Sequence, residues 1–214
     1  MIYLEETFNL KQASWEALDN FIDFSRQYLV PLCPKLGAKL IAAWSSDEEW
    51  FCQVKQVMAF EDMDALKSFR ISCSQSKAWG EYAAGLEEHA PVRRSRLLKP
   101  LEGVPQFIDE TIAESAKSPN HGYLHAILEV DTGKMETFRT GLASRPKESP
   151  IIACWQPVSG SPNEVIDIWK SPAAPKTAYE PATEEMRQFF RMVRDMAPKE
   201  RAIRMVSLPY SPLK

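Results

Sequence analysis

The feature of this sequence that most constrains its fold is a strand–turn–strand pattern that occurs twice. Residues 151–169 contain two apolar runs, and the Gly/Ser/Pro/Asn cluster at 159–163 separates them. Residues 40–60 contain the same pattern, and the hairpin positions Trp44 and Trp155 lie 111 residues apart, as do Val54 and Val165. Two hairpins in one register predict that the chain is built from two copies of one unit.

The segments around each hairpin show the same alternation of strand and helix signals. Residues 2–10 alternate apolar and polar side chains, as a strand with one buried face does. Ser14 and Thr183 are N-cap residues placed before helical patterns. Strands are expected at residues 2–10, 92–99, 123–130 and 202–208, and strand pairs (hairpins) at 40–60 and 151–169. Helices are expected at residues 14–29, 62–90 and 134–145, and a fourth starts at residue 183. Pro31, Pro34 and Gly37 are expected to close the first helix, and residues 72–76 interrupt the second.

Each half therefore has the order β-α-β-β-α-β of a ferredoxin-like unit. We expect an α+β fold with repeat 1 at residues 1–100, a linker at 101–120 that forms a short helix, and repeat 2 at 121–214. The opening strands present one apolar face and one mixed face, and the mixed face suits the partly polar interior of a small barrel. The sequence predicts two ferredoxin-like repeats that close into one pseudo-two-fold α/β barrel.

Composition excludes several function classes. The chain is 44% hydrophobic and 26% charged with a net charge of −3, so it is expected to be an ordinary globular protein without a nucleic-acid partner. No apolar run approaches the roughly 18 residues of a membrane helix, and the start of the chain does not look like a signal peptide. Four cysteines without C-x-x-C spacing favour free thiols in a reducing compartment, so the cytoplasm is expected.

Short motifs in the second hairpin resemble the NIPSNAP family. Its return strand, roughly N-x-V-x-H-[LI]-W in that family, matches at Asn163, Val165, Ile168 and Trp169, and the stretches 2–4 and 96–100 are also similar. Asp167 stands where the family usually has histidine, and Gln56 stands at the matching place in the first half. The resemblance covers nearly the whole chain twice. It implies the dimeric α/β-barrel fold and, since the family has no agreed activity, implies no reaction.

Three side chains are candidates for catalysis. His125 is expected to point into the barrel near Glu5, where a carboxylate orients a neutral imidazole as a general base; a hydrogen-bonded core histidine is the open alternative. Asp167 lies between two isoleucines, so it needs a partner, for which Arg201 or Arg204 is available, or it has a role in a site.

Other side chains are candidates for binding a ligand. The expected interior residues are Tyr3, Trp44, Gln56, Tyr123, Ile127 and Trp155, with the two tryptophans either covering a flat apolar molecule or packing at the rim. His121 and His125 are four residues apart on a strand, which places their Cβ atoms about 13 Å apart, too far to share a metal ion. We expect no metal and no cofactor, because the chain contains no glycine-rich phosphate loop or metal motif.

Three hypotheses of function remain open on the sequence. The first is a NIPSNAP-like protein that binds a small, largely apolar molecule between its two sheets. The second is a cofactor-independent enzyme of the monooxygenase or isomerase type, with His125 as general base. The third is a structural protein that forms a homo-oligomer and has no ligand.

Overall fold

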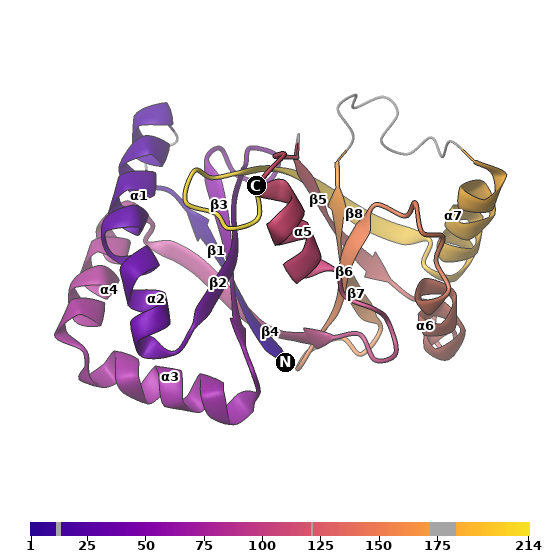
Figure 1. The fold of residues 1–214 in the computed structure, drawn as a ribbon, viewed down its shortest axis with the longest axis horizontal. Helices are drawn as coiled ribbons and strands as arrows, with labels where there is room; N and C mark the ends of the chain where they lie inside the picture. Colours follow the sequence, from indigo (N-terminus) through magenta and orange to yellow (C-terminus); the bar gives the residue numbers. More distant parts are fainter. Residues whose placement is uncertain (12–13, 121, 172–182) are drawn as a thin grey trace. The chain divides into compact units, whose positions relative to one another are not determined.

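The structure, a computed structural model, describes residues 1–11, 14–120, 122–171 and 183–214. Fifteen elements occur in these residues (Figure 1). The strands are β1 (Ile2–Asn9), β2 (Lys39–Ser46), β3 (Gln53–Phe60), β4 (Val92–Pro100), β5 (Tyr123–Glu129), β6 (Ile151–Pro157), β7 (Glu164–Lys170) and β8 (Lys199–Ser207). The helices are α1 (Trp15–Gln27), α2 (Leu29–Leu36), α3 (Met63–Gln75), α4 (Lys77–His89), α5 (Ile108–Ser115), α6 (Met135–Ala143) and α7 (Glu184–Met196).

The chain divides into two compact units. Unit 1 comprises Met1–Leu98 together with Val206–Lys214, and unit 2 comprises Lys99–Met205. The last residues of the chain therefore belong with the first unit, whereas the segment 101–120 belongs with the second. The predicted domain bounds come from the repeat pattern in the sequence and not from the contacts that define these units. The division into 1–100, 101–120 and 121–214 stays a prediction.

The two units have the same strand order. Unit 1 has the order β4-β1-β3-β2, and unit 2 has the order β8-β5-β7-β6, which place the first strand of each half beside its third and fourth strands. The end of β8 also pairs with β2, at Trp44–Ser207 and Ser45–Val206. The pairing of β8 with β2 falls within unit 1, and its pairing with β5 falls within unit 2. The closure of the two sheets into one barrel stays a prediction. The predicted α+β class is confirmed.

Both hairpins contain the same irregularity. The register between β2 and β3 shifts between Leu40 and Ala42, and the register between β6 and β7 shifts between Ile151 and Ala153. These bulges lie 111 residues apart, the offset that relates the hairpins in the sequence. The matching bulges agree with the predicted two-fold repeat, which stays a prediction.

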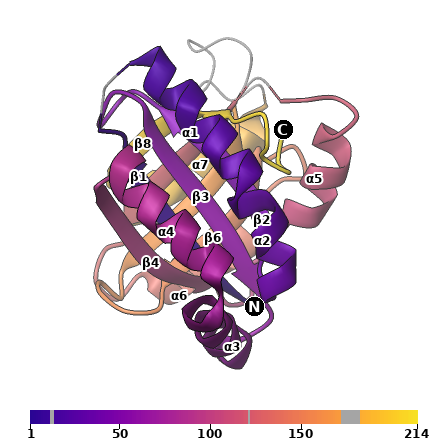
Figure 2. The ribbon, with the colours of Figure 1, turned by 90° about the vertical axis from the view of Figure 1, so that its left-hand side faces the viewer.

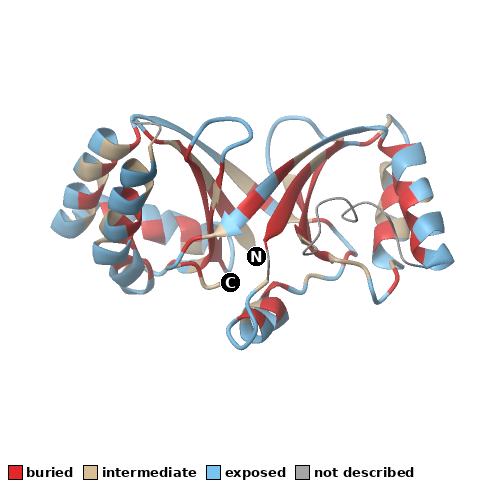
Figure 3. Cartoon of the chain, turned by 90° about the horizontal axis from the view of Figure 1, so that it is seen from above, coloured by how far each residue is buried: buried red, intermediate tan, exposed pale blue. Residues whose placement is uncertain are grey.

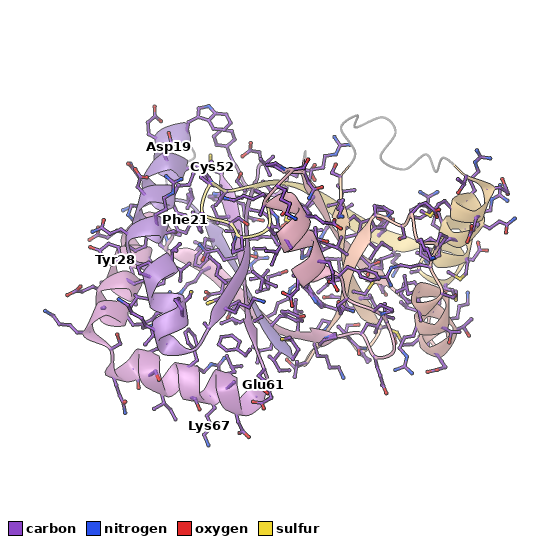
Figure 4. All side chains as sticks on the ribbon, viewed as in Figure 1. Asp19, Phe21, Tyr28, Cys52, Glu61 and Lys67 are labelled. Atoms are coloured by element: carbon purple, nitrogen blue, oxygen red, sulfur yellow. The ribbon has the colours of Figure 1, made fainter. Side chains whose placement is uncertain are left out.

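Helices cover one face of the sheet in each unit. In unit 1 the helices α1 to α4 lie on one side of the strands, as the side view shows (Figure 2). Figure 4 shows Asp19 of α1 and Lys67 of α3 extending outward, whereas Phe21 lies between α1 and the sheet and belongs to the buried core. In unit 2 the helices α6 and α7 pack side by side. The sheet-facing sides of the helices are buried and their outer sides are exposed (Figure 3), as amphipathic patterning requires.

The prolines after the first helix have a different role from the expected one. They were expected to close it, but α2 contains both Pro31 and Pro34 and ends at Gly37, which adopts φ +86°. Pro31 falls in the first turn of α2, where backbone N–H groups have no acceptor within the helix, so the missing N–H costs little. The chain therefore bends at Tyr28 between two helices, and the glycine terminates the second one in the left-handed conformation.

No helix among the residues that the structure describes is long and apolar enough to cross a bilayer.

Candidate functional site

The predicted site residues of unit 1 lie on two different faces of its sheet. Tyr3 and Glu5 alternate on β1 with Leu4, which packs in the helix-covered core, so both project from the opposite face. The Glu5 carboxylate, which is 2% exposed, accepts a hydrogen bond from Nε of Arg96 at 2.8 Å across the β1–β4 ladder. Trp44 on β2 is also buried. Glu5 is thus part of a buried ion pair within unit 1.

Gln56 lies on the helix-covered face of unit 1. It alternates on β3 with Lys55 and Val57 and shares its face with Val54 and Met58 of the core. Its Nε2 donates a hydrogen bond to the hydroxyl of Tyr210 at 2.6 Å. The register therefore places Gln56 and Glu5 on opposite sides of the same sheet.

The face of the unit 2 sheet that points away from α6 and α7 brings together four of the predicted residues. Tyr123, His125 and Ile127 project from it on β5, because Leu124, Ala126 and Leu128 occupy the helix-covered core, and Trp155 projects from it on β6. His125 is fully buried, and its cross-strand neighbours are Ile168 on β7 and Ile203 on β8.

The Tyr123 hydroxyl, next to this face, has a polar partner. It accepts a hydrogen bond from Nδ2 of Asn120 at 2.7 Å. Burial raises the pKa of the Tyr123 phenol, so the group remains a neutral donor and acceptor at physiological pH. The proposed pairing of His125 with Glu5 of unit 1 stays a prediction.

Asp167 projects from the other side of the unit 2 sheet. Its cross-strand partners are Ala126 on β5 and Cys154 on β6, both in the helix-covered core, so it and His125 lie on opposite faces. The expected ion pair of Asp167 with Arg201 or Arg204 of β8 does not form: neither carboxylate oxygen of Asp167 has a hydrogen-bond partner among the described residues, and β5 lies between β7 and β8.

Burial dominates the electrostatics of the Asp167 carboxyl. Desolvation raises its pKa from 3.8 to about 7, while the Cys154 thiol and the more distant Arg145 charge partly oppose that rise. Its oxygens have no hydrogen-bond partner of normal geometry among the described residues, so the thiol is a weak polar neighbour rather than a strong donor. Burial also raises the pKa of the Cys154 thiol well above its usual value, which leaves the thiol protonated and unreactive.

A pocket opens elsewhere in unit 2, beside α5. Its volume is about 410 Å³, and none of the nine predicted site residues lines it. Its walls come from the segment before α5, from one side of α5, from the residues after α6, and from the adjoining ends of β6 and β7. The lining residues are Pro105, Phe107, Glu110, Thr111, Glu114, Ala143, Arg145, Pro146, Lys147, Ser149, Ile151, Ile152 and Lys170.

Backbone hydrogen bonds hold one wall of this pocket against β6. The N–H of Leu101 donates to the Cys154 carbonyl at 2.9 Å, and the N–H of Phe107 donates to the Ile152 carbonyl at 2.7 Å. Between them, Oε1 of Gln106 accepts from the N–H of Cys154 at 3.0 Å. The segment 101–107 thus runs along β6, and α5, which follows it, lies beside that strand (Figure 1).

Charged and apolar side chains occupy separate parts of the pocket. Ile151 and Ile152 are buried, and Phe107 exposes 42% of its surface, so they supply an apolar base. Lys170 and Glu114 form an ion pair with 2.8 Å between Nζ and Oε2 on the α5 side. An apolar base with a few convergent polar groups is the usual composition of a small-molecule site.

The sequence pattern did not indicate this pocket. The segment 101–120 was expected to be a covering linker with a short helix, and that helix forms as α5. The pocket itself arises from contacts between residues far apart in the chain, such as Phe107 with Ile152. The one local signal is an aromatic residue, Phe107, left without a place in either repeat.

No group of three or more metal-binding side chains comes together within the described parts of the chain. His121, which strand spacing places too far from His125 to share a metal ion, lies outside the described residues.

Comparison with known proteins shows the fold. No protein-family model and no curated protein matches the sequence. A solved structure of a candidate monooxygenase from Fusobacterium nucleatum is similar at 11% identity, with 97% of this chain and 92% of that chain covered and a TM-score of 0.65. A candidate monooxygenase from Lactobacillus acidophilus is similar at 13% identity, with coverage of 96% and 93% and a TM-score of 0.59.

NIPSNAP-domain proteins are also among the similar structures. One from Burkholderia xenovorans is 15% identical and covers 50% of this chain and 100% of its own, with a TM-score of 0.44. A likeness of that size does not assign this chain to the family. At such identities the similar structures establish an α+β, ferredoxin-like architecture and nothing about the reaction or the ligand.

Proposed function

We propose that this chain is a NIPSNAP-like binding protein for a small, largely apolar molecule, and that the pocket beside α5 is its site. The observation that carries the proposal is the pocket itself, because 410 Å³ lies within the range of roughly 300 to 1,000 Å³ typical of small-molecule sites. The NIPSNAP-like part of the proposal comes from the sequence motifs alone.

The lining supports an apolar occupant. Phe107 remains 42% exposed although it stands beside the buried Ile151 and Ile152. A ligand that covered the phenyl ring and the mouth of the pocket would remove this apolar surface from water, which stabilises a complex by roughly 25 cal/mol for each Å² buried.

A substitution at the mouth of the pocket tests the proposal. Ala143 is exposed and lines the pocket, so Ala143→Trp fills it without entering the core. The neutral aromatic 2-naphthalenemethanol serves as the test ligand. We expect the wild-type chain to bind one molecule, and Ala143→Trp to weaken binding at least about tenfold by steric exclusion. Isothermal titration calorimetry measures both values.

Ala113→Trp is the matched control, because Ala113 is an exposed residue of α5 that does not line the pocket. This variant should bind as the wild type does. Equal binding by all three proteins would show that the ligand sits elsewhere, and the predicted placement on Tyr3, Trp44, Tyr123 and Trp155 between the sheets would become the next candidate.

The other functions remain untested hypotheses. A cofactor-independent monooxygenase or isomerase is supported by likeness of fold alone, and Asp167 lies on the face opposite His125. A structural homo-oligomer has no separate observation in its favour. The predicted cytoplasmic location likewise stays a prediction.

A further inference from the structure

Arg145 is held in a defined orientation at the pocket. Its Nη1 donates to the Leu142 carbonyl at 3.1 Å, and its Nη2 donates to the Pro105 carbonyl at 2.8 Å. The guanidinium carbon lies 4.9 Å from the centre of the Phe107 ring, which adds a cation–π contact. The half-buried guanidinium therefore bridges the end of α6 and the segment before α5.

Among the residues that the structure describes, no carboxylate lies within ion-pair distance of the Arg145 guanidinium, and the buried Asp167 carboxyl interacts with its charge only at longer range. A guanidinium has five N–H donors, and the two carbonyl bonds leave three of them for another acceptor. The neighbouring cation Lys170 differs, because Glu114 pairs with it at 2.8 Å. Arg145 is thus a fixed positive charge with spare donors beside the apolar base of the pocket.

The remaining charged groups of the lining are consistent with an anionic occupant. Lys147 adds a second positive charge at an exposed position. Of the two acidic residues, Glu114 is neutralised by Lys170, and Glu110 is an exposed residue of α5. The part of the pocket formed by residues 145–147 therefore carries net positive charge, and the carboxylates lie on α5.

We infer that the occupant of this pocket is an amphipathic carboxylic acid whose flat apolar part covers Phe107 and Ile152 and whose carboxylate binds the guanidinium of Arg145. This inference rests on the proposed function and names the chemical class of its ligand. A carboxylate matches the planar donor fork of arginine, and a charge-assisted pair of this kind is about twice as strong as a neutral hydrogen bond.

The test compares three naphthalene derivatives of one shape that differ in charge: 2-naphthoate, 2-naphthalenemethanol and 2-naphthylmethylammonium. Calorimetric titration of the full chain at low salt should show 2-naphthoate binding about tenfold or more tighter than the alcohol, with the ammonium compound weakest. Arg145→Gln should remove the preference for 2-naphthoate while the affinity for the alcohol changes by less than about twofold.

Arg191→Gln is the control, since it removes the same charge from unit 2 at an exposed position of α7 outside the pocket. It should keep the preference for 2-naphthoate. The wild-type comparison decides the question even if Arg145→Gln disturbs the loop that it bridges.

Three results would overturn the inference. Equal wild-type affinity for 2-naphthoate and the alcohol would overturn the inferred carboxylic acid, while the proposed function, with a neutral apolar ligand, would stand. Tighter binding of the ammonium compound would assign recognition to Glu110. Absence of binding by all three compounds would remove the proposed function together with this inference.

Discussion

Asp167 is a carboxyl group in a place that disfavours charge. It is fully buried in the helix-covered core of unit 2, and its closest polar neighbour on the adjacent strand is the thiol of Cys154. An ionised carboxylate there would lose its hydration without gaining an ion pair, which costs several kcal/mol. Burial raises the pKa of this carboxyl to about 7, so the neutral form predominates below that pH and the penalty for charge appears above it.

The raised pKa of Asp167 predicts a pH dependence of stability. Below the unfolded pKa of about 3.8 the carboxyl is protonated in both states, so it imposes no penalty. Between that value and about 7 the unfolded chain releases the proton first, and the free energy of unfolding falls as pH rises. The full penalty, roughly 4 kcal/mol for a displacement of about three pKa units, is present above about pH 7.

Asp167→Asn should therefore be more stable than the wild type at pH 8 and should lose much of that advantage at pH 4. Chemical unfolding followed across this range measures the difference. Asp195→Asn is the control, because Asp195 is an exposed carboxylate in the same unit and its replacement should leave the slope unchanged. If the free energies of unfolding of the wild type and Asp167→Asn changed in parallel with pH, the raised pKa of Asp167 would be contradicted.

The alternation of single side chains in the opening strands could be read from the sequence. Leu124 and Leu128 face the helices and Tyr123 and His125 face away, as the period-2 pattern predicts. The facing of Gln56 could not be read in the same way, because polar residues occur on both faces of β3, Lys55 on one and Gln56 on the other. The packing of Val54 and Met58 in the core shows that Gln56, which shares their face, points toward the helices.

Among the secondary-structure elements, the helix starts follow the predicted capping chemistry. Oγ of Ser14 accepts from the N–H of Ala17 at 3.2 Å, and Oγ1 of Thr183 accepts from the N–H of Met186 at 3.2 Å. In α7 the cap precedes a strongly amphipathic helix whose Phe190 stacks on Trp169 of β7, with ring centroids 5.2 Å apart. The position of this cap therefore determines which side chains meet the sheet.

Thr183→Ala should destabilise unit 2 by about 1 kcal/mol, because it leaves an N-terminal N–H of α7 without its acceptor. The loss should appear as faster hydrogen exchange in the first turn of α7 and a lower midpoint in urea. Thr183→Ser keeps the hydroxyl and should behave as the wild type does. A Ser variant as unstable as the Ala variant would indicate that the threonine methyl group, and not the cap, matters.

The segment 101–120 shows where element-level prediction stops. The composition between Pro105 and Pro119 indicated the short helix correctly. Its role as a wall of the pocket depends on the bond from Phe107 to Ile152, which no local pattern encodes. The position of Arg145 at the pocket could not be predicted either, because it depends on how the residues after α6 and the segment before α5 pack together.

On the scale of the whole molecule, the two units are interleaved along the chain. Residues after β8 return to unit 1, where the N–H of Leu208 donates to the Ala43 carbonyl at 2.9 Å and the N–H of Leu213 donates to the Ile41 carbonyl at 3.2 Å. The Tyr210 hydroxyl also accepts from Gln56 at 2.6 Å. The sequence pattern predicted contiguous halves, because periodicity locates repeats and does not show which contacts a terminal segment makes.

Deletion of residues 208–214 should therefore destabilise unit 1 more than unit 2. It removes these hydrogen bonds and the buried side chains of Leu208 and Leu213, a loss of roughly 4 kcal/mol or more. Hydrogen exchange should accelerate in β2 and β3 while β5 and β7 change little. Deletion of Lys214 alone is the control, and uniform acceleration in both units would contradict this division.

The return of the C-terminal segment to unit 1 has a consequence for biosynthesis. A ribosome makes the first ninety-eight residues of that unit early, yet residues 206–214 appear only after all of unit 2 has been translated. Until then the emerging polypeptide presents the unpaired edge of β2, a surface on which nascent chains aggregate or recruit chaperones. Completion of unit 1 therefore waits for the synthesis of residues that follow unit 2 in the chain.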